Sequence, residues 1–146
     1  MKSLYLHDNN IEELESLDEL EGLTHLYLQN NRLKSIAKGM QGCKNLTKLY
    51  LNGNSISCLE GLEGCAKLAE LHLSDQKLSP GVEMQFSSSS LQAVGRTLIV
   101  LTMPNAGITS LEPLVHLEYL QRLDVANNNI AEMKAVLGFT GVASQL

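Results

Sequence analysis

Four histidines and three cysteines are the side chains of this 146-residue sequence most able to do chemistry. His72, Ser74 and Asp75 lie close enough together to suggest a hydrolytic trio. In a strand, however, residues two apart lie about 7 Å from each other, which is too far for a nucleophile to hydrogen-bond to its base. The sequence also lacks the Gly-x-Ser-x-Gly motif that exposes a serine nucleophile. We therefore predict that the chain is not an enzyme.

Metal, redox and cofactor sites are not predicted either. His7 and His25 belong to neighbouring copies of a repeat but are four positions out of register, so they are poorly placed to share a metal ion. The three cysteines have no zinc-binding spacing, and their odd number argues against a disulfide framework. Cys43 and Cys65 fill a slot that leucine fills elsewhere, which predicts core thiols, whereas Cys58 is expected to be partly exposed. No Walker loop, dinucleotide glycine fingerprint or EF-hand pattern is present, and we expect no cofactor.

The elements that carry these side chains are copies of one unit. Six segments fit the frame LxxLxLxxNxL, and they begin near residues 1, 23, 46, 68, 98 and 120. The segments are MKSLYLHDNNI, LTHLYLQNNRL, LTKLYLNGNSI, LAELHLSDQKL, LIVLTMPNAGI and LQRLDVANNNI. A repeat of this length predicts a solenoid, because one unit cannot bury its own leucines but stacked neighbours can. We expect one domain over residues 1–146, with an extended fourth repeat over 68–97.

Each copy is expected to contribute one strand and one turn. The alternation of Leu26, Tyr27 and Leu28 predicts a short strand with both leucines inward and the tyrosine outward. The strands should stack into a parallel sheet on the concave face. Apolar residues at a spacing of three then predict short 3-10 or α turns on the convex face. The fold class is therefore an α/β solenoid of about six repeats.

An asparagine follows each strand, and its amide can satisfy backbone groups of the turn. The asparagines at this position are Asn9, Asn31, Asn54 and Asn128. Gln76 and Ala106 replace it in the fourth and fifth copies, so these two turns are expected to be less regular. The glutamate-rich stretch from Glu12 to Glu21 is interpreted as the solvated side of the first turn.

The extended fourth repeat contains an insertion between Leu78 and Leu98. Pro80 and Gly81 predict a turn, and the serines at 87–90 offer N-caps for a helix over Leu91 to Arg96. The insertion is either an embellishment of the convex side or part of a partner site.

The exposed strand positions are the best candidate for a function. Tyrosines recur at the same position of three consecutive copies, and tyrosine offers a large contact area together with a hydroxyl group. The face mixes charges with an acidic lean, and the chain has a formal net charge of −5, which favours a protein partner over nucleic acid. The predicted partner-binding residues are Tyr5, His25, Tyr27, Lys48, Tyr50, Glu70, His72, Thr102, Arg122 and Asp124.

The frame LxxLxLxxNxIxxIxxLxxLxx resembles the 22-residue intracellular class of leucine-rich repeats. Residues 23 to 130 are similar to the testis-type leucine-rich repeat regulatory subunits of protein phosphatase 1. The ELH segment with a glutamine at the asparagine position, and the long fourth repeat, carry this similarity. It implies a regulatory or targeting module that binds the phosphatase catalytic subunit through its concave face. The short basic-Val-x-Phe docking segment that many phosphatase regulators carry is not found.

An alternative function is a structural scaffold or adaptor of centrosomal, flagellar or microtubule assemblies, with tubulin or another cytoskeletal protein as partner and without phosphatase binding. The sequence has no apolar run near the roughly 20 residues of a membrane span and no signal-peptide core. A cytoplasmic location is therefore expected, and the resemblance implies the centrosome, basal body or flagellum. The first copy opens at Met1, and the pattern fades after Met133, so we expect an incompletely capped chain that lacks some of its parent's repeats.

Overall fold

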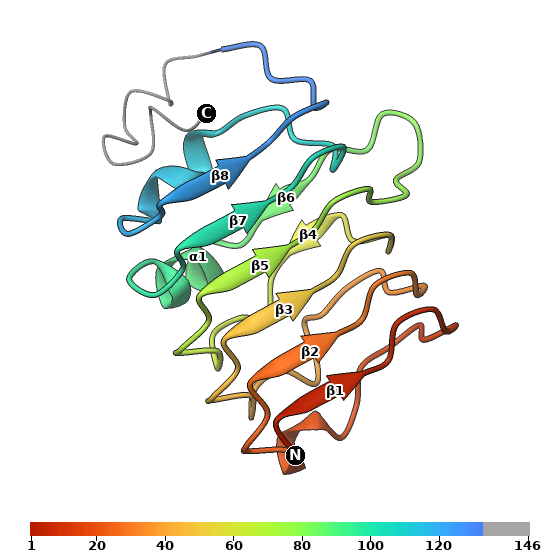
Figure 1. Cartoon of the computed structure of the whole chain (residues 1–146). Coiled ribbons are helices and arrows are strands. Elements are labelled where there is room, and N and C mark those ends of the chain that lie inside the picture. The colour runs from red at the N-terminus through yellow and green to blue at the C-terminus, as the bar shows by residue number, and fades with distance from the viewer. Residues whose placement is uncertain (133–146) are drawn as a thin grey trace.

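The computed structural model of the chain describes residues 1–132, and its repeated strands form one continuous sheet (Figure 1). This sheet has six strands in the order β1-β2-β3-β5-β7-β8, and every neighbouring pair is parallel. The strands are β1 (Ser3–Tyr5), β2 (His25–Tyr27), β3 (Lys48–Tyr50), β5 (Glu70–His72), β7 (Val100–Thr102) and β8 (Arg122–Asp124). Because each strand lies beside the strand of the next copy, β1 and β8 are at opposite ends of the molecule (Figure 1). The predicted parallel-sheet solenoid is confirmed.

An aliphatic core lies behind the sheet. Leu26 and Leu28 were expected to point inward, and both side chains are fully buried. Each such leucine contributes about 1.5–3 kcal/mol through removal of its surface from water. Cys43 and Cys65 are free thiols in the same core, and Cys58 is only half-buried, as the sequence predicted.

Short elements cover the convex side. They are η1 (Leu17–Glu19), η2 (Glu112–His116), the helix α1 (Ser88–Val94) and the strands β4 (Cys58–Leu59) and β6 (Gln85–Phe86). The two 3-10 turns confirm the expectation from the spacing of three. The parallel pair formed by β4 and β6 was not predicted, because strands of two residues are too short to leave a periodic pattern.

The helix in the extended fourth repeat begins earlier than predicted. Its N-cap is Ser87, whose hydroxyl accepts a hydrogen bond from the backbone N–H of Ser90 at 3.5 Å, so the helix begins at Ser88. Ser90 is buried, and its hydroxyl accepts from the N–H of Leu62 and donates to Glu63. Because α1 packs beside η2 and β6 pairs with β4, these parts of the insertion lie on the convex side. This placement favours the first of the two alternatives for the insertion.

Side-chain amides satisfy the turns that follow the strands. The oxygen of Asn54 accepts from the N–H of Leu33 in the preceding copy at 3.0 Å, and its nitrogen donates to the carbonyl of Leu28 at 2.9 Å. Asn31 and Asn128 make the equivalent pair of contacts with their own preceding copies. The predicted role of these asparagines is confirmed.

The prediction that Gln76 interrupts this series is wrong. Its oxygen accepts from the N–H of Ile56 at 2.9 Å and its nitrogen donates to the carbonyl of Leu51 at 3.0 Å, which is the asparagine pattern. Glutamine ends in the same amide as asparagine, and its extra methylene is accommodated. Only Ala106 lacks the amide, and there the N–H of Leu78 donates to the carbonyl of Gln76 instead.

Within residues 1–132, no helix is both long and apolar enough to cross a lipid bilayer. The expected fading of the repeat after Met133 lies outside the described residues.

Candidate functional site

The face of the six-stranded sheet that is turned away from the core, here called the concave face, carries the predicted site residues in two rows. Parallel pairing brings equivalent residues of the copies side by side. The central row is Tyr5, Tyr27, Tyr50, His72, Thr102 and Asp124. The flanking row is Ser3, His25, Lys48, Glu70, Val100 and Arg122. All ten predicted residues therefore lie on one continuous surface.

The rings of Tyr5, Tyr27, Tyr50 and His72 form one stack, which we call the tyrosine ladder. Successive ring centroids are 4.5, 4.7 and 4.7 Å apart, and successive ring planes are inclined by 12°, 6° and 9°. These distances match the spacing of neighbouring strands, which is about 4.8 Å. The sheet therefore builds the stack simply by placing an aromatic residue at the same position of four copies. Tyr5, at the end of the ladder, remains 62% exposed.

Stacking changes the acidity of the phenol groups. Burial by its neighbours raises the pKa of Tyr27, and the adjacent Tyr50 and Tyr5 raise it further because phenolates repel. Burial also raises the pKa of Tyr50, followed by the effect of the nearby Glu70 carboxylate. Both hydroxyls are therefore protonated, and able to donate hydrogen bonds, at neutral pH.

Beyond the tyrosines the concave face becomes polar and ionic. Nδ1 of His72 lies 2.6 Å from the Thr102 hydroxyl, and its Nε2 lies 3.6 Å from the Glu70 carboxylate. The same carboxylate lies 3.8 Å from Nζ of Lys48. Such partly exposed ion pairs stabilise a protein by roughly 0–1 kcal/mol, so their main effect is to orient the side chains. His72 bonds to Thr102 and not to Ser74, so the structure assembles no hydrolytic trio there.

A row of residues in the left-handed backbone region borders the concave face. These residues are Asp8, Asn30, Gly53, Asp75, Asn105 and Asn127, with φ between 51° and 71°. Asparagine, aspartate and glycine tolerate this conformation better than other residues do. This conformation was not predicted, although a row made only of aspartate, asparagine and glycine is typical of it. Two side-chain hydrogen bonds link neighbours in it, Asn30 to Asp8 at 2.8 Å and Asn105 to Asp75 at 3.1 Å.

Sequence reasoning missed a third row on the concave face. The alternation continues one step past each strand and brings His7, Gln29, Asn52 and Ser74 into line. The His7 ring meets Tyr5 edge-on at 6.3 Å, which places this row beside the tyrosine ladder. Among residues 1–132, the side-chain oxygens of Gln29 and Asn52 are buried without a hydrogen-bond partner. A count of two residues onward from Tyr27 and Tyr50 would have found them.

The remaining histidine candidates form no metal site. Nδ1 of His25 lies 2.8 Å from the Thr24 hydroxyl, and His25 pairs in register with Ser3, four residues before His7. In the part of the chain that the structure describes, no group of three or more histidine, cysteine, aspartate or glutamate side chains could hold a metal ion.

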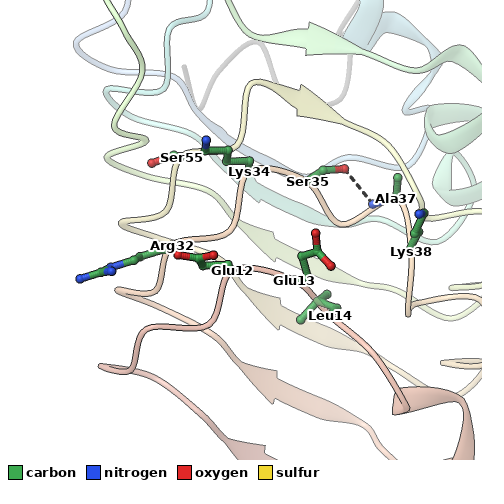
Figure 2. Close-up of a pocket in the computed structure, with 9 residues that line it drawn as sticks. All are labelled: Glu12, Glu13, Leu14, Arg32, Lys34, Ser35, Ala37, Lys38 and Ser55. Carbon is green, nitrogen blue, oxygen red and sulfur yellow. Dashed lines mark hydrogen bonds between the residues drawn. The ribbon is translucent and has the colours of Figure 1, made fainter.

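A charged cavity of about 610 Å³ is lined by residues that belong to none of the six strands of the sheet (Figure 2). It is lined by Glu12, Glu13, Leu14, Arg32, Lys34, Ser35, Ala37, Lys38 and Ser55. The two glutamates come from the first copy and the three cations from the second, so the walls carry opposite charge (Figure 2). Glu12 and Glu13 are exposed, as predicted. The basic wall opposite them was not predicted.

Two family models match the sequence. A model described as "Leucine rich repeat" matches residues 21–78, and one described as "Leucine Rich repeats (2 copies)" matches residues 1–38. Together they cover residues 1–78, which is more than half of the chain.

Solved structures share the fold. An internalin (inlF) from Listeria monocytogenes is 25% identical with a TM-score of 0.78, and the match covers 97% of this chain and 39% of the internalin chain. A second structure is the LRR ectodomain of the receptor kinase GASSHO1/SCHENGEN3 from Arabidopsis thaliana, solved in complex with CASPARIAN STRIP INTEGRITY FACTOR 2. It is 20% identical to this chain with a TM-score of 0.66, and the match covers 97% of this chain and 17% of the receptor chain. A chain of a complex of Latrophilin 3, Unc5D and FLRT2 (LRR) is 21% identical with a TM-score of 0.65 over 87% of this chain and 40% of its own.

This chain thus spans less than half the length of each of these three structures. Leucine-rich repeat domains generally mediate protein–protein binding and are typically not enzymes. The repeat frame, the parallel sheet with its leucine core, and the two matching models establish that the chain belongs to the leucine-rich repeat proteins.

Proposed function

We propose that this chain is a non-enzymatic module that binds a protein partner through its concave face, with the tyrosine ladder at the centre of the contact. The observation that carries this proposal is the ladder itself. Four aromatic rings lie in one line on the side of the sheet opposite the leucine core, with Tyr5 mostly exposed. Rigid aromatic side chains are frequent anchors of protein interfaces, because they offer a large contact area and lose little entropy on binding.

The partner we propose is the catalytic subunit of protein phosphatase 1, which this chain would regulate or target. The support is the sequence similarity of residues 23–130 to the testis-type regulatory subunits, above all the ELH segment and the extended fourth repeat. The proposed locations are the cytoplasm and the centrosome, basal body or flagellum. Fluorescence imaging of the tagged chain against a basal-body marker tests the location separately from binding.

A pull-down with the purified catalytic subunit tests the proposed surface. Wild type is compared with Tyr27→Ala/Tyr50→Ala, which removes the middle of the ladder. Lys34→Ala/Lys38→Ala, in the charged cavity, is the matched control. We expect the tyrosine variant to lose at least tenfold in affinity, which corresponds to about 1.4 kcal/mol, and the lysine variant to bind like wild type. Equal capture by wild type and the tyrosine variant would reject the concave face as the binding surface.

The scaffold alternative is tested with the same proteins. Co-sedimentation with polymerised microtubules, together with no capture of the phosphatase, would favour a cytoskeletal adaptor. Phosphatase capture without co-sedimentation supports the regulatory module.

A further inference from the structure

The stacking of the tyrosine ladder limits which parts of its rings a partner can touch, and this inference rests on the proposed function of the concave face. Neighbouring rings are nearly parallel and 4.5–4.7 Å apart. Each ring of Tyr27 and Tyr50 is therefore covered on both faces by its neighbours. A partner that approaches the concave face meets ring edges and phenol hydroxyls, not ring faces.

Edges and faces of an aromatic ring attract different groups. The face of the ring is electron-rich and attracts cations, whereas the edge carries partial positive charge. Because the faces of Tyr27 and Tyr50 are covered, the middle of the ladder cannot hold an arginine or lysine by a cation–π contact. The outward edges attract electron-rich groups instead.

The phenol hydroxyls add hydrogen-bond donors. Within residues 1–132, the one hydrogen bond that involves a ladder hydroxyl joins the side chains of Tyr5 and Tyr27. The Tyr50 hydroxyl and one hydroxyl of the Tyr5–Tyr27 pair can therefore each donate to an acceptor of the partner.

The flanking row adds a cation beside the tyrosine hydroxyls. Lys48 and His25 lie beside Tyr50 and Tyr27, with the Lys48 side chain 38% exposed. The Glu70 carboxylate near them lies 3.8 Å from Nζ of Lys48, which partly balances its charge. Around the three tyrosines the two predicted rows therefore contain donors and one cation, and no carboxylate other than Glu70.

We propose that the tyrosine ladder recognises an acidic segment of its protein partner. Aspartate and glutamate carboxylates of this segment accept hydrogen bonds from the phenol hydroxyls and lie against the ring edges. Hydrogen bonds to an ionised acceptor are roughly twice as strong as neutral ones, so a carboxylate fits this surface better than a backbone carbonyl does.

Fluorescence anisotropy with three labelled peptides of equal length tests the chemistry of the partner. The peptides have Gly-Ser spacers and carry six glutamates, six lysines or no charge. We expect the glutamate peptide to bind wild type at least tenfold more tightly than the lysine peptide does. Tyr27→Phe/Tyr50→Phe keeps the stacked rings and removes two hydroxyls, and we expect it to weaken binding of the glutamate peptide about tenfold. Tyr119→Phe, at a tyrosine that is 57% exposed outside the ladder, should bind like wild type.

Two results would overturn the inference. One is a glutamate peptide that binds no better than the lysine peptide, which includes the absence of any binding. The other is unchanged binding of the glutamate peptide to the phenylalanine variant. The pull-down with the phosphatase then distinguishes failure of the acidic-segment inference from failure of the proposed function. Phosphatase capture that is lost with alanine but kept with phenylalanine contradicts the acidic-segment inference alone, whereas capture that is kept with both contradicts the proposed function.

Discussion

Tyr27 shows how a single residue can serve both the fold and the surface. Its ring packs against Tyr5 on one side and Tyr50 on the other, which holds three strands in register. Stacked aromatic pairs contribute about 0.5–1.5 kcal/mol beyond the area they bury. The same stacking leaves ring edges on the concave face, so the residue stabilises the sheet and also forms part of the proposed binding surface.

A second residue-scale effect concerns the backbone at Gly61. This glycine has φ = +80°, and a Cβ at this position would collide with the carbonyl oxygen of Ile36. Gly81 has nearly the same φ, +82°, but has no atom within 4 Å of the equivalent position.

We therefore predict that Gly61→Ala destabilises the protein more than Gly81→Ala does. Both variants bear the cost of a left-handed alanine, about 1–2 kcal/mol. Only Gly61→Ala adds the displacement of backbone, roughly another 1–3 kcal/mol. Urea unfolding followed by circular dichroism measures the difference, and equal midpoints for the two variants would disprove the packing described at Gly61.

At the scale of the elements, the amide that follows each strand joins one turn to the next. Gln76 takes part in this series although it is not asparagine, since its amide bonds to Ile56 and Leu51 of the third copy. Asn9, at the same position of the first copy, is exposed, and within residues 1–132 its side chain bonds only to the carbonyls of Leu6 and His7 in its own copy.

Gln76→Ala should therefore cost about 1–3 kcal/mol, because it leaves buried backbone groups without hydrogen bonds. The matched variant Asn9→Ala should cost no more than about 0.5 kcal/mol, because water can replace its contacts at an exposed site. Chemical denaturation of both variants checks this expectation. A Gln76→Ala protein as stable as Asn9→Ala would mean that the glutamine does not replace asparagine.

Particular residues show which features of the fold and of the site could be predicted from the sequence and which could not. The strands and the two predicted rows could be located because alternation with period two fixes which side chains face outward, as at Tyr27 and Tyr50. Gln76 was misjudged because the pattern was matched by residue type instead of by the amide group. The charged cavity was missed because its walls, such as Glu12 and Arg32, come from different copies and face each other only after the solenoid is stacked.

At the scale of the whole molecule, several groups make the fold sensitive to alkaline pH. Burial raises the pKa of Cys65 to about 12, and it also raises the pKa values of Tyr27 and Tyr50 above their usual value near 10. All three groups are neutral when protonated, so the folded state favours the proton more than the unfolded state does. Their contribution to stability is complete below the unfolded pKa values and is lost as the pH rises through the folded ones.

We predict that the free energy of unfolding is nearly constant from pH 7 to about 8.5 and falls between about pH 9 and 12. For Cys65 the loss amounts to roughly 1.4 kcal/mol for each unit by which its folded pKa exceeds the unfolded value. Tyr27→Phe/Tyr50→Phe removes the tyrosine part and should lose less stability over the same range, with the remainder due to Cys65. Urea titrations at intervals of one pH unit make the comparison. Identical losses for wild type and the variant would contradict the raised tyrosine values.

The proposed function requires that a partner protein contacts the tyrosine ladder. Site-specific photo-crosslinking tests it most directly, with benzoylphenylalanine in place of Tyr50 in one protein and of Lys34 in another. After irradiation with the phosphatase catalytic subunit, we predict that position 50 forms a covalent complex and that position 34, in the charged cavity, does not. A complex formed only from position 34 would place the interface outside the concave face and contradict the account.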